Sequence, residues 1–134
     1  MFNKLVTSFF AITLTSFLAQ GASNVAHSPT LKEVTVGISD VYVPGGFDSE
    51  ADSYVVVSGI FPNGCYQWKG GEVTSPTTFT HEIRSIASVS QGMCTMALIP
   101  FAKEIRIGKL ETGDHTLRFV NGDGTYLERV LTIE

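Results

Sequence analysis

The stretch "HTLRFVNGDGTYLERVLTIE", His115 to Glu134, decides the fold that we expect for this chain of 134 residues. Its two halves each alternate apolar and polar residues, and "NGDG" separates them. Period-two alternation is typical of strands with one buried face, whereas a helix would repeat its apolar residues about every 3.6 positions. Asn-Gly and Asp-Gly pairs favour the positive φ that tight hairpin turns need. The stretch therefore predicts a β-hairpin with one apolar face.

Similar strand-like runs precede this hairpin. They are "EVTVGISDVYV" (33–43), "SYVVVSGIF" (53–61), "CTMALIPF" (94–101) and "KEIRIGKL" (103–110). In the first run Val41 is out of phase with Val34 and Val36, which predicts a bulge or bend near Ser39 and Asp40. Turn residues separate the runs at 44–46, 62–64, 69–71, 75–76, 111–114 and 121–124. About seven or eight short strands without a helix predict an all-β protein, either a β-sandwich or a small barrel. Of the two we favour an antiparallel β-sandwich.

The N-terminal residues are typical of an export signal. Lys4 precedes an uncharged apolar run, "LVTSFFAITLTSFLA", and small residues follow in "AQGAS". A membrane helix needs about 20 apolar residues, and this run is shorter. We therefore expect a signal peptide at 1–22, a flexible segment at 23–30 and a single β-sandwich domain at 31–134. The protein is expected to be secreted or periplasmic, with no membrane insertion after signal cleavage.

The charge of the chain argues against a nucleic-acid partner. The formal net charge is −4, whereas binding to phosphates requires a basic stripe or patch. Lys103, Arg106 and Lys109 form one basic cluster, but Glu104 and Glu111 interrupt it. We interpret this cluster as a solvated strand face.

The chain has two cysteines, Cys65 directly after the turn "PNG" and Cys94 after "SQGM". An even, small number of cysteines in an exported protein favours a disulfide. Cys94 is expected to begin a strand, and Trp68 is a candidate to pack near the bridge. A zinc site would need four ligands, often in close pairs, and the cysteines and histidines are far apart. A reactive Cys-His pair is the other alternative.

The stretch "LETGDHTLRF", Leu110 to Phe119, resembles the corner of immunoglobulin-like and fibronectin-type secreted β-sandwich domains. In that pattern a leucine, a glycine and a tyrosine lead into a strand, and the tyrosine hydroxyl bonds back to the backbone. His115 occupies the tyrosine position here, and its imidazole could make a related bond. The resemblance implies an immunoglobulin-like sandwich.

The stretch "SPTTF" is similar to a loop of chagasin-like inhibitors, which are secreted proteins that block papain-type proteases. Serine replaces the asparagine of their pattern and phenylalanine replaces the glycine. The similarity implies an alternative function, inhibition of an extracellular cysteine protease. The candidate inhibitor loop is Ser75, Pro76, Thr77, Thr78 and Phe79.

Residues that could perform chemistry are few. Asp48, Glu50 and Asp52 alternate in one loop and are weak candidates for a calcium site, which needs six to eight oxygen ligands. His81 lies on a partly apolar strand face, where a structural role is expected. The sequence contains no G-x-S-x-G, no H-E-x-x-H and no phosphate-binding glycine loop. We therefore predict no enzyme activity, no catalytic residue and no cofactor.

Aromatic residues near strand ends offer a possible interface, because such side chains are enriched where proteins bind one another. The candidates are Tyr42, Tyr66, Trp68 and Tyr126. The sequence thus predicts an exported, non-enzymatic β-sandwich that binds a protein or is a structural component of the cell envelope or extracellular space. A calcium- or carbohydrate-binding module is a further alternative.

Overall fold

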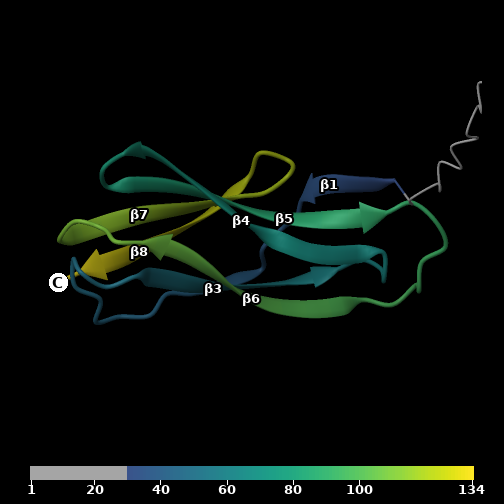
Figure 1. Cartoon of the computed structure of the whole chain (residues 1–134), viewed down its shortest axis with the longest axis horizontal. Coiled ribbons are helices and arrows are strands. Elements are labelled where there is room, and N and C mark those ends of the chain that lie inside the picture. Colours follow the sequence, from purple (N-terminus) through teal and green to yellow (C-terminus); the bar gives the residue numbers. More distant parts are fainter. Residues whose placement is uncertain (1–29) are drawn as a thin grey trace, which may run out of the picture.

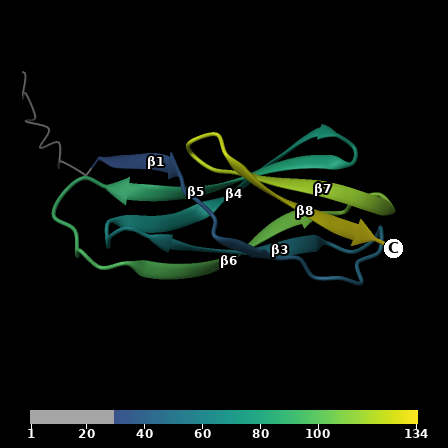
Figure 2. The same cartoon turned by 180° about the vertical axis from the view of Figure 1, so that it is seen from behind.

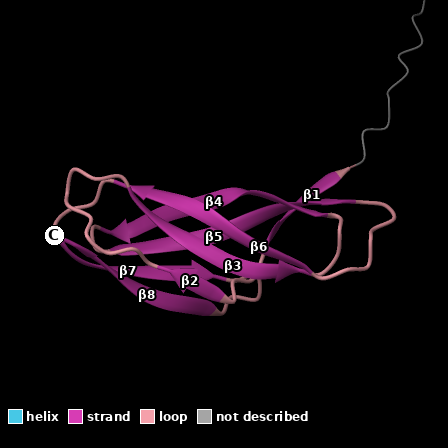
Figure 3. Cartoon of the chain, turned by 90° about the horizontal axis from the view of Figure 1, so that it is seen from below, coloured by secondary structure: helices cyan, strands magenta, loops and turns pink. Residues whose placement is uncertain are grey.

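The computed structural model describes residues 30–134, and this part of the chain consists of strands and loops (Figures 1 and 3). The expected signal peptide and nearly all of the expected flexible segment lie outside these residues. The eight strands are β1 (Leu31–Thr35), β2 (Asp40–Tyr42), β3 (Ser53–Phe61), β4 (Tyr66–Thr77), β5 (Thr80–Ser90), β6 (Ile99–Gly108), β7 (Gly113–Val120) and β8 (Tyr126–Ile133). The described residues include no helix long and apolar enough to cross a membrane.

The strands form two sheets, which confirms the all-β sandwich. One sheet has five strands, with β4 on one side of β5 and with β1 and β7 on its other side, followed by β8. The second sheet has the order β2-β3-β6. The strands follow the long axis of the molecule, and the second sheet lies below the first in Figure 1. All pairs are antiparallel except β5 with β7, which run parallel.

The hairpin predicted at 115–134 is present. Strands β7 and β8 pair from Gly113↔Ile133 to Val120↔Tyr126. In the connecting turn only Gly124 has a positive φ, of 87°, so the turn is not the tight two-residue type. Asp123 Oδ1 accepts hydrogen bonds from the Thr125 backbone N–H at 3.0 Å and from its hydroxyl at 2.6 Å. These bonds stabilise the longer turn.

The core lies between the sheets and has two parts. Alternate residues of β3 and β7 point inward, as period-two burial requires. The larger cluster contains Val41, Val55, Val57, Ile83, Ile105, Leu117, Phe119, Leu131 and Ile133. The smaller cluster contains Val36, Phe61, Ala87 and Phe101, and half-buried Tyr66 and Trp68 pack against it.

The change of phase near Ser39 and Asp40 has a larger cause than a bulge. β1 pairs with β5 in the five-stranded sheet, whereas β2 pairs with β3 in the other sheet. The chain therefore crosses between the sheets at residues 36–39. Val36 and Val41 are both buried in the core although their spacing is odd.

Two predicted turns, at 69–71 and 75–76, were wrong. β4 runs through both to Thr77, with register shifts between Trp68 and Gly70 and between Thr74 and Thr77. Gly71 is required for close packing, because a Cβ there would lie 2.6 Å from Ile105 Cγ2 in the opposite sheet. The chain turns instead at residues 78–79, directly before β5.

The strand predicted at 94–101 begins late. β6 starts at Ile99, and Cys94 lies in the preceding loop rather than at the start of a strand. Met96 and Leu98 are 86% and 72% exposed, so their alternation does not reflect a buried face. The loop is tied to the β3–β4 turn by the disulfide and by a 2.8 Å hydrogen bond from Gly64 N–H to Thr95 O. The disulfide and this hydrogen bond, and not strand pairing, therefore fix the path of the loop before β6.

Candidate functional site: an aromatic groove between two open strand edges

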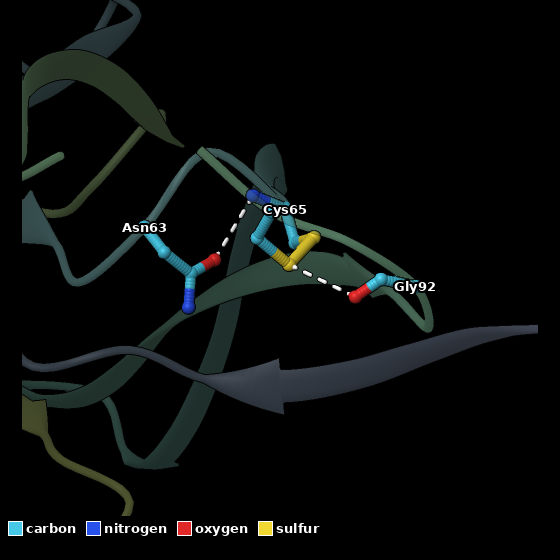
Figure 4. Close-up of a disulfide and its surroundings, with 4 residues drawn as sticks. Asn63, Cys65 and Gly92 are labelled. Carbon is cyan, nitrogen blue, oxygen red and sulfur yellow. Dashed lines mark hydrogen bonds between the residues drawn. A yellow bond between two sulfur atoms is a disulfide. The ribbon is translucent and has the colours of Figure 1, made fainter. Parts of the chain in front are cut away.

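A disulfide joins Cys65 to Cys94, as predicted, with their Cα atoms 5.2 Å apart. Figure 4 shows how the turn "PNG" prepares this bond: Asn63 Oδ1 accepts a 2.9 Å hydrogen bond from the Cys65 N–H. Cys94 Sγ lies 3.5 Å from the Gly92 carbonyl oxygen. The bridge therefore attaches the loop between the two sheets, which rounds one end of the molecule in Figure 2, to the start of β4.

Next to this turn a groove of about 470 Å³ lies between β4 and β6. One wall comes from the start of β4 and the other from the start of β6. The lining residues are Phe61, Tyr66, Gln67, Trp68, Ile99, Pro100, Phe101, Ala102 and Lys103. Phe61 and Phe101 also belong to the smaller core cluster, so the groove lies at the outer border of that cluster.

Four aromatic rings give the groove its shape. Phe61 stacks on Phe101 with ring centroids 4.3 Å apart, and Tyr66 stacks on Phe61 at 5.8 Å. Trp68 packs on Phe101 at 5.7 Å. A Cβ at Gly59 would lie 2.6 Å from the Phe101 ring, so the absence of a side chain at this glycine leaves room for the ring. Because Trp68 comes from β4 and Phe101 from β6, the stack joins the two sheets.

Both strands that border the groove have an unpaired edge. β4 pairs with β5 alone and β6 with β3 alone among the described strands. Backbone N–H and C=O groups along such edges can pair with another extended chain. At the groove, exposed apolar residues continue along the chain from Ile99 (38% exposed) into the preceding loop, where Met93 is fully exposed. This combination is suited to contact with a protein.

The structure brings two of the four candidate interface aromatics together and places the other two elsewhere. Tyr66 and Trp68 share the groove, while Tyr42 lies on β2, across β3 from β6. Tyr126 is the first residue of β8, which is the edge strand of the five-stranded sheet opposite β4. Its ring centroid is 5.5 Å from the Arg118 guanidinium. Phe61 and Phe101 complete the groove and were not foreseen, since nothing in the sequence pairs two phenylalanines on different strands.

The candidate inhibitor loop is the tip of the β4–β5 hairpin. Ser75, Pro76 and Thr77 belong to β4, and Thr78 and Phe79 form the turn. The Phe79 ring packs on His115 with centroids 4.9 Å apart. The tip is therefore a short turn held against β7.

The acidic loop, which carries Asp48, Glu50 and Asp52, forms its own local structure. Asp48 Oδ1 accepts a 3.0 Å hydrogen bond from the Glu50 N–H. Glu50 Oε2 lies 4.0 Å from Lys109 Nζ, and both side chains are exposed. Within residues 30–134, no three His, Cys, Asp or Glu side chains gather so that they could hold a metal ion.

The two histidines of the fold lie beneath the hairpin tip. His81 is 2% exposed and His115 is fully buried, with His81 Nε2 at 2.8 Å from His115 Nδ1. His115 Nε2 donates a 2.6 Å hydrogen bond to the Glu111 carbonyl oxygen. His115 thus bonds back to the backbone four residues upstream in the sequence. Burial, and then the neighbouring His115, lower the pKa of His81 below its usual 6.5.

Comparison with known protein families shows which family the chain resembles. The family model described as the ORF11 beta-sandwich domain matches residues 55–132. This range is more than half of the chain and includes both cysteines, both buried histidines and the whole groove lining. It supports the β-sandwich and not the finer resemblance to immunoglobulin-like or chagasin-like proteins. No curated protein and no solved structure matches the chain.

Proposed function

The chain belongs to the ORF11 β-sandwich domain family, and from this premise we propose that it is an exported, non-enzymatic protein that binds another protein of the cell envelope or extracellular space. The observation that carries the proposal is the aromatic groove between the unpaired edges of β4 and β6. Isolated apolar side chains are common on protein surfaces, but a groove built from several aromatic rings beside open strand edges is typical of an interaction site.

The expected partner is an extended segment of another protein. Such a segment can add to the edge of β6 through its backbone and place alternate side chains in the groove. Tyr66, Trp68 and Phe101 would contact an apolar side chain of the partner. Lys103 at the groove would favour an acidic residue in the partner.

The disulfide supports the expected compartment. A bond between Cys65 and Cys94 is compatible with an oxidising environment, such as a periplasm or the extracellular space. It also holds the exposed loop before β6 beside the groove, so the binding surface is ordered before a partner arrives. A preordered surface costs less entropy on binding.

Site-specific photo-cross-linking in the source cells tests the proposal. A photoreactive residue replaces Gln67, which is exposed in the groove, or Tyr42, which is 65% exposed on β2. We expect Gln67 to capture one recurrent exported protein through an extended segment, and Tyr42 not to capture it. Equal capture from both positions, or none from Gln67, would contradict the proposal.

Affinity for the captured protein then tests the aromatic anchor. Trp68→Ala is expected to weaken binding by about 10-fold or more, the loss typical of a central aromatic contact. The matched control Tyr42→Ala should bind as the original chain does. Circular dichroism establishes that both variants remain folded. Unchanged affinity in folded Trp68→Ala would reject the groove as the binding site.

A further inference from the structure

A chain of hydrogen bonds near the β4–β5 hairpin tip has no part in the proposed binding groove. Ser75 Oγ lies 2.6 Å from His81 Nδ1, and His81 Nε2 lies 2.8 Å from His115 Nδ1. His115 Nε2 lies 2.6 Å from the carbonyl oxygen of Glu111. A hydroxyl, an imidazole and an orienting group in hydrogen-bond contact are the arrangement that activates serine nucleophiles.

The direction of these bonds follows from the last acceptor. A carbonyl oxygen accepts only, so His115 Nε2 carries a proton. In neutral His115 the Nδ1 atom is then an acceptor, which requires a proton on His81 Nε2. In neutral His81 the Nδ1 atom is consequently an acceptor, and it receives the proton of the Ser75 hydroxyl. With both histidines neutral, the hydrogen bonds allow this one arrangement of protons. It makes His81 Nδ1 the acceptor, and therefore the base, for the proton of the Ser75 hydroxyl.

The local backbone explains why Ser75 reaches His81. Thr74 pairs with Glu82, and continuing that register by one residue places Ser75 opposite His81. A register shift follows before Thr77 pairs with Thr80, so the strand bulges at Pro76. Proline is tolerated at bulges of edge strands. The bulge lies where β4 has no outer neighbour among the described strands, and Ser75 is exposed while His81 is buried.

We propose that Ser75 is a nucleophile that His81 activates, and that it accepts an acyl group from an activated ester. The Ser75 oxygen forms a bond to the acyl carbon while its proton moves to His81 Nδ1. The bond from the acyl carbon to the leaving oxygen breaks, and that oxygen takes the proton from His81. The products are an acyl ester of Ser75 and the free alcohol, with no oxidant or further reactant.

The chemistry around Ser75 restricts the acyl donor. In many serine hydrolases the backbone N–H of the residue after the nucleophile stabilises the oxyanion. Pro76 follows Ser75 and has no N–H. Because that stabilisation is missing, a reactive donor must have a good leaving group, such as an aryl ester. Amides should not react at a comparable rate, so the site fits acylation by activated esters and not peptide cleavage.

The test uses p-nitrophenyl acetate with the folded chain. We expect release of nitrophenol and the mass gain of one acetyl group per chain, located on Ser75 by peptide mapping. Ser75→Ala should lose this label. Ser49→Ala removes an exposed serine from the acidic loop and should label as the original chain does. Acetylation of Ser75 no faster than that of other exposed serines would overturn the proposal.

The role of the histidines is tested separately. His81→Gln should slow acetylation of Ser75 by about 100-fold, the lower range for loss of a general base. His115 acts as a positioning residue through His81. His115→Gln keeps an acceptor and a donor and should retain more labelling than His115→Leu, compared under conditions where both are folded by circular dichroism. Equal labelling in folded His81→Gln would overturn the activation. None of these outcomes depends on the binding groove.

Discussion

At the residue scale, the buried pair of His81 and His115 is the most constrained feature of the molecule. With both rings neutral, every ring nitrogen has a partner: Ser75, the other ring, or the Glu111 carbonyl. One added proton can reside on His81 Nδ1 without loss of a bond, because the Ser75 oxygen can accept. A second proton would place two N–H groups face to face. The pair therefore tolerates at most one charge.

This arrangement predicts a loss of stability in acid. Burial and His115 lower the folded-state pKa of His81 below 6.5, so between these two values the unfolded chain binds more protons than the folded chain. The free energy of unfolding should be highest above about pH 6.5 and should decrease as pH falls towards the lowered pKa. Urea unfolding at a series of pH values measures this slope. His81→Gln should flatten it, and an unchanged slope in that variant would contradict the assignment.

At the scale of elements, β4 departs most from a regular strand. It changes register twice against β5, and a distinct local feature lies next to each shift. At the first shift the strand adjusts next to Gly71, whose missing Cβ leaves room for Ile105. At the second, the bulge at Pro76 leaves Ser75 over His81. The loop before β6 is the opposite case, since a disulfide and not a strand ladder fixes its path.

The disulfide predicts a stability loss that depends on oxidation. It closes a loop between positions separated by 29 residues, and Cys65→Ala with Cys94→Ala should lower the free energy of unfolding by about 2–4 kcal/mol. Urea unfolding with and without a reductant gives the measurement. The reductant should destabilise the original chain and leave the double variant unchanged. A double variant as stable as the oxidised chain would show that the bridge contributes nothing.

At the scale of the whole molecule, the two sheets are joined differently along their two long sides. On one side the C-terminal end of β8 is tied to the loop before β3, through a bridge between Phe47 and Ile133 and a 2.8 Å bond from Glu134 N–H to Phe47 O. On the other side β4 and β6 are not paired, and the rings of Trp68 and Phe101 connect them. The aromatic stack thus closes the sandwich and also forms the groove for which we propose a binding role.

Phe101 should therefore matter to the whole fold. Phe101→Ala removes a ring that is 8% exposed and contacts both sheets, and it should cost about 3–5 kcal/mol in the free energy of unfolding. Ile99→Ala, at an exposed position of the same groove, should cost clearly less. Denaturant unfolding of both variants gives the comparison. Similar losses would mean that Phe101 does not connect the sheets.

The sequence by itself determined what depends on local order: the strand periodicity, the hairpin at 115–134 and hence the β-sandwich. It also determined the disulfide, because a chain with two cysteines has one possible intrachain pairing. Period-two burial and turn chemistry act between near neighbours, so they can be seen in the chain. It also pointed to Tyr66 and Trp68 but not to Phe61 and Phe101. Only the tertiary structure decided the groove, the parallel pairing of β5 with β7, and the Ser75–His81–His115 chain. These features join residues distant in sequence, and their positions depend on sheet order, register shifts and packing, which no local pattern encodes.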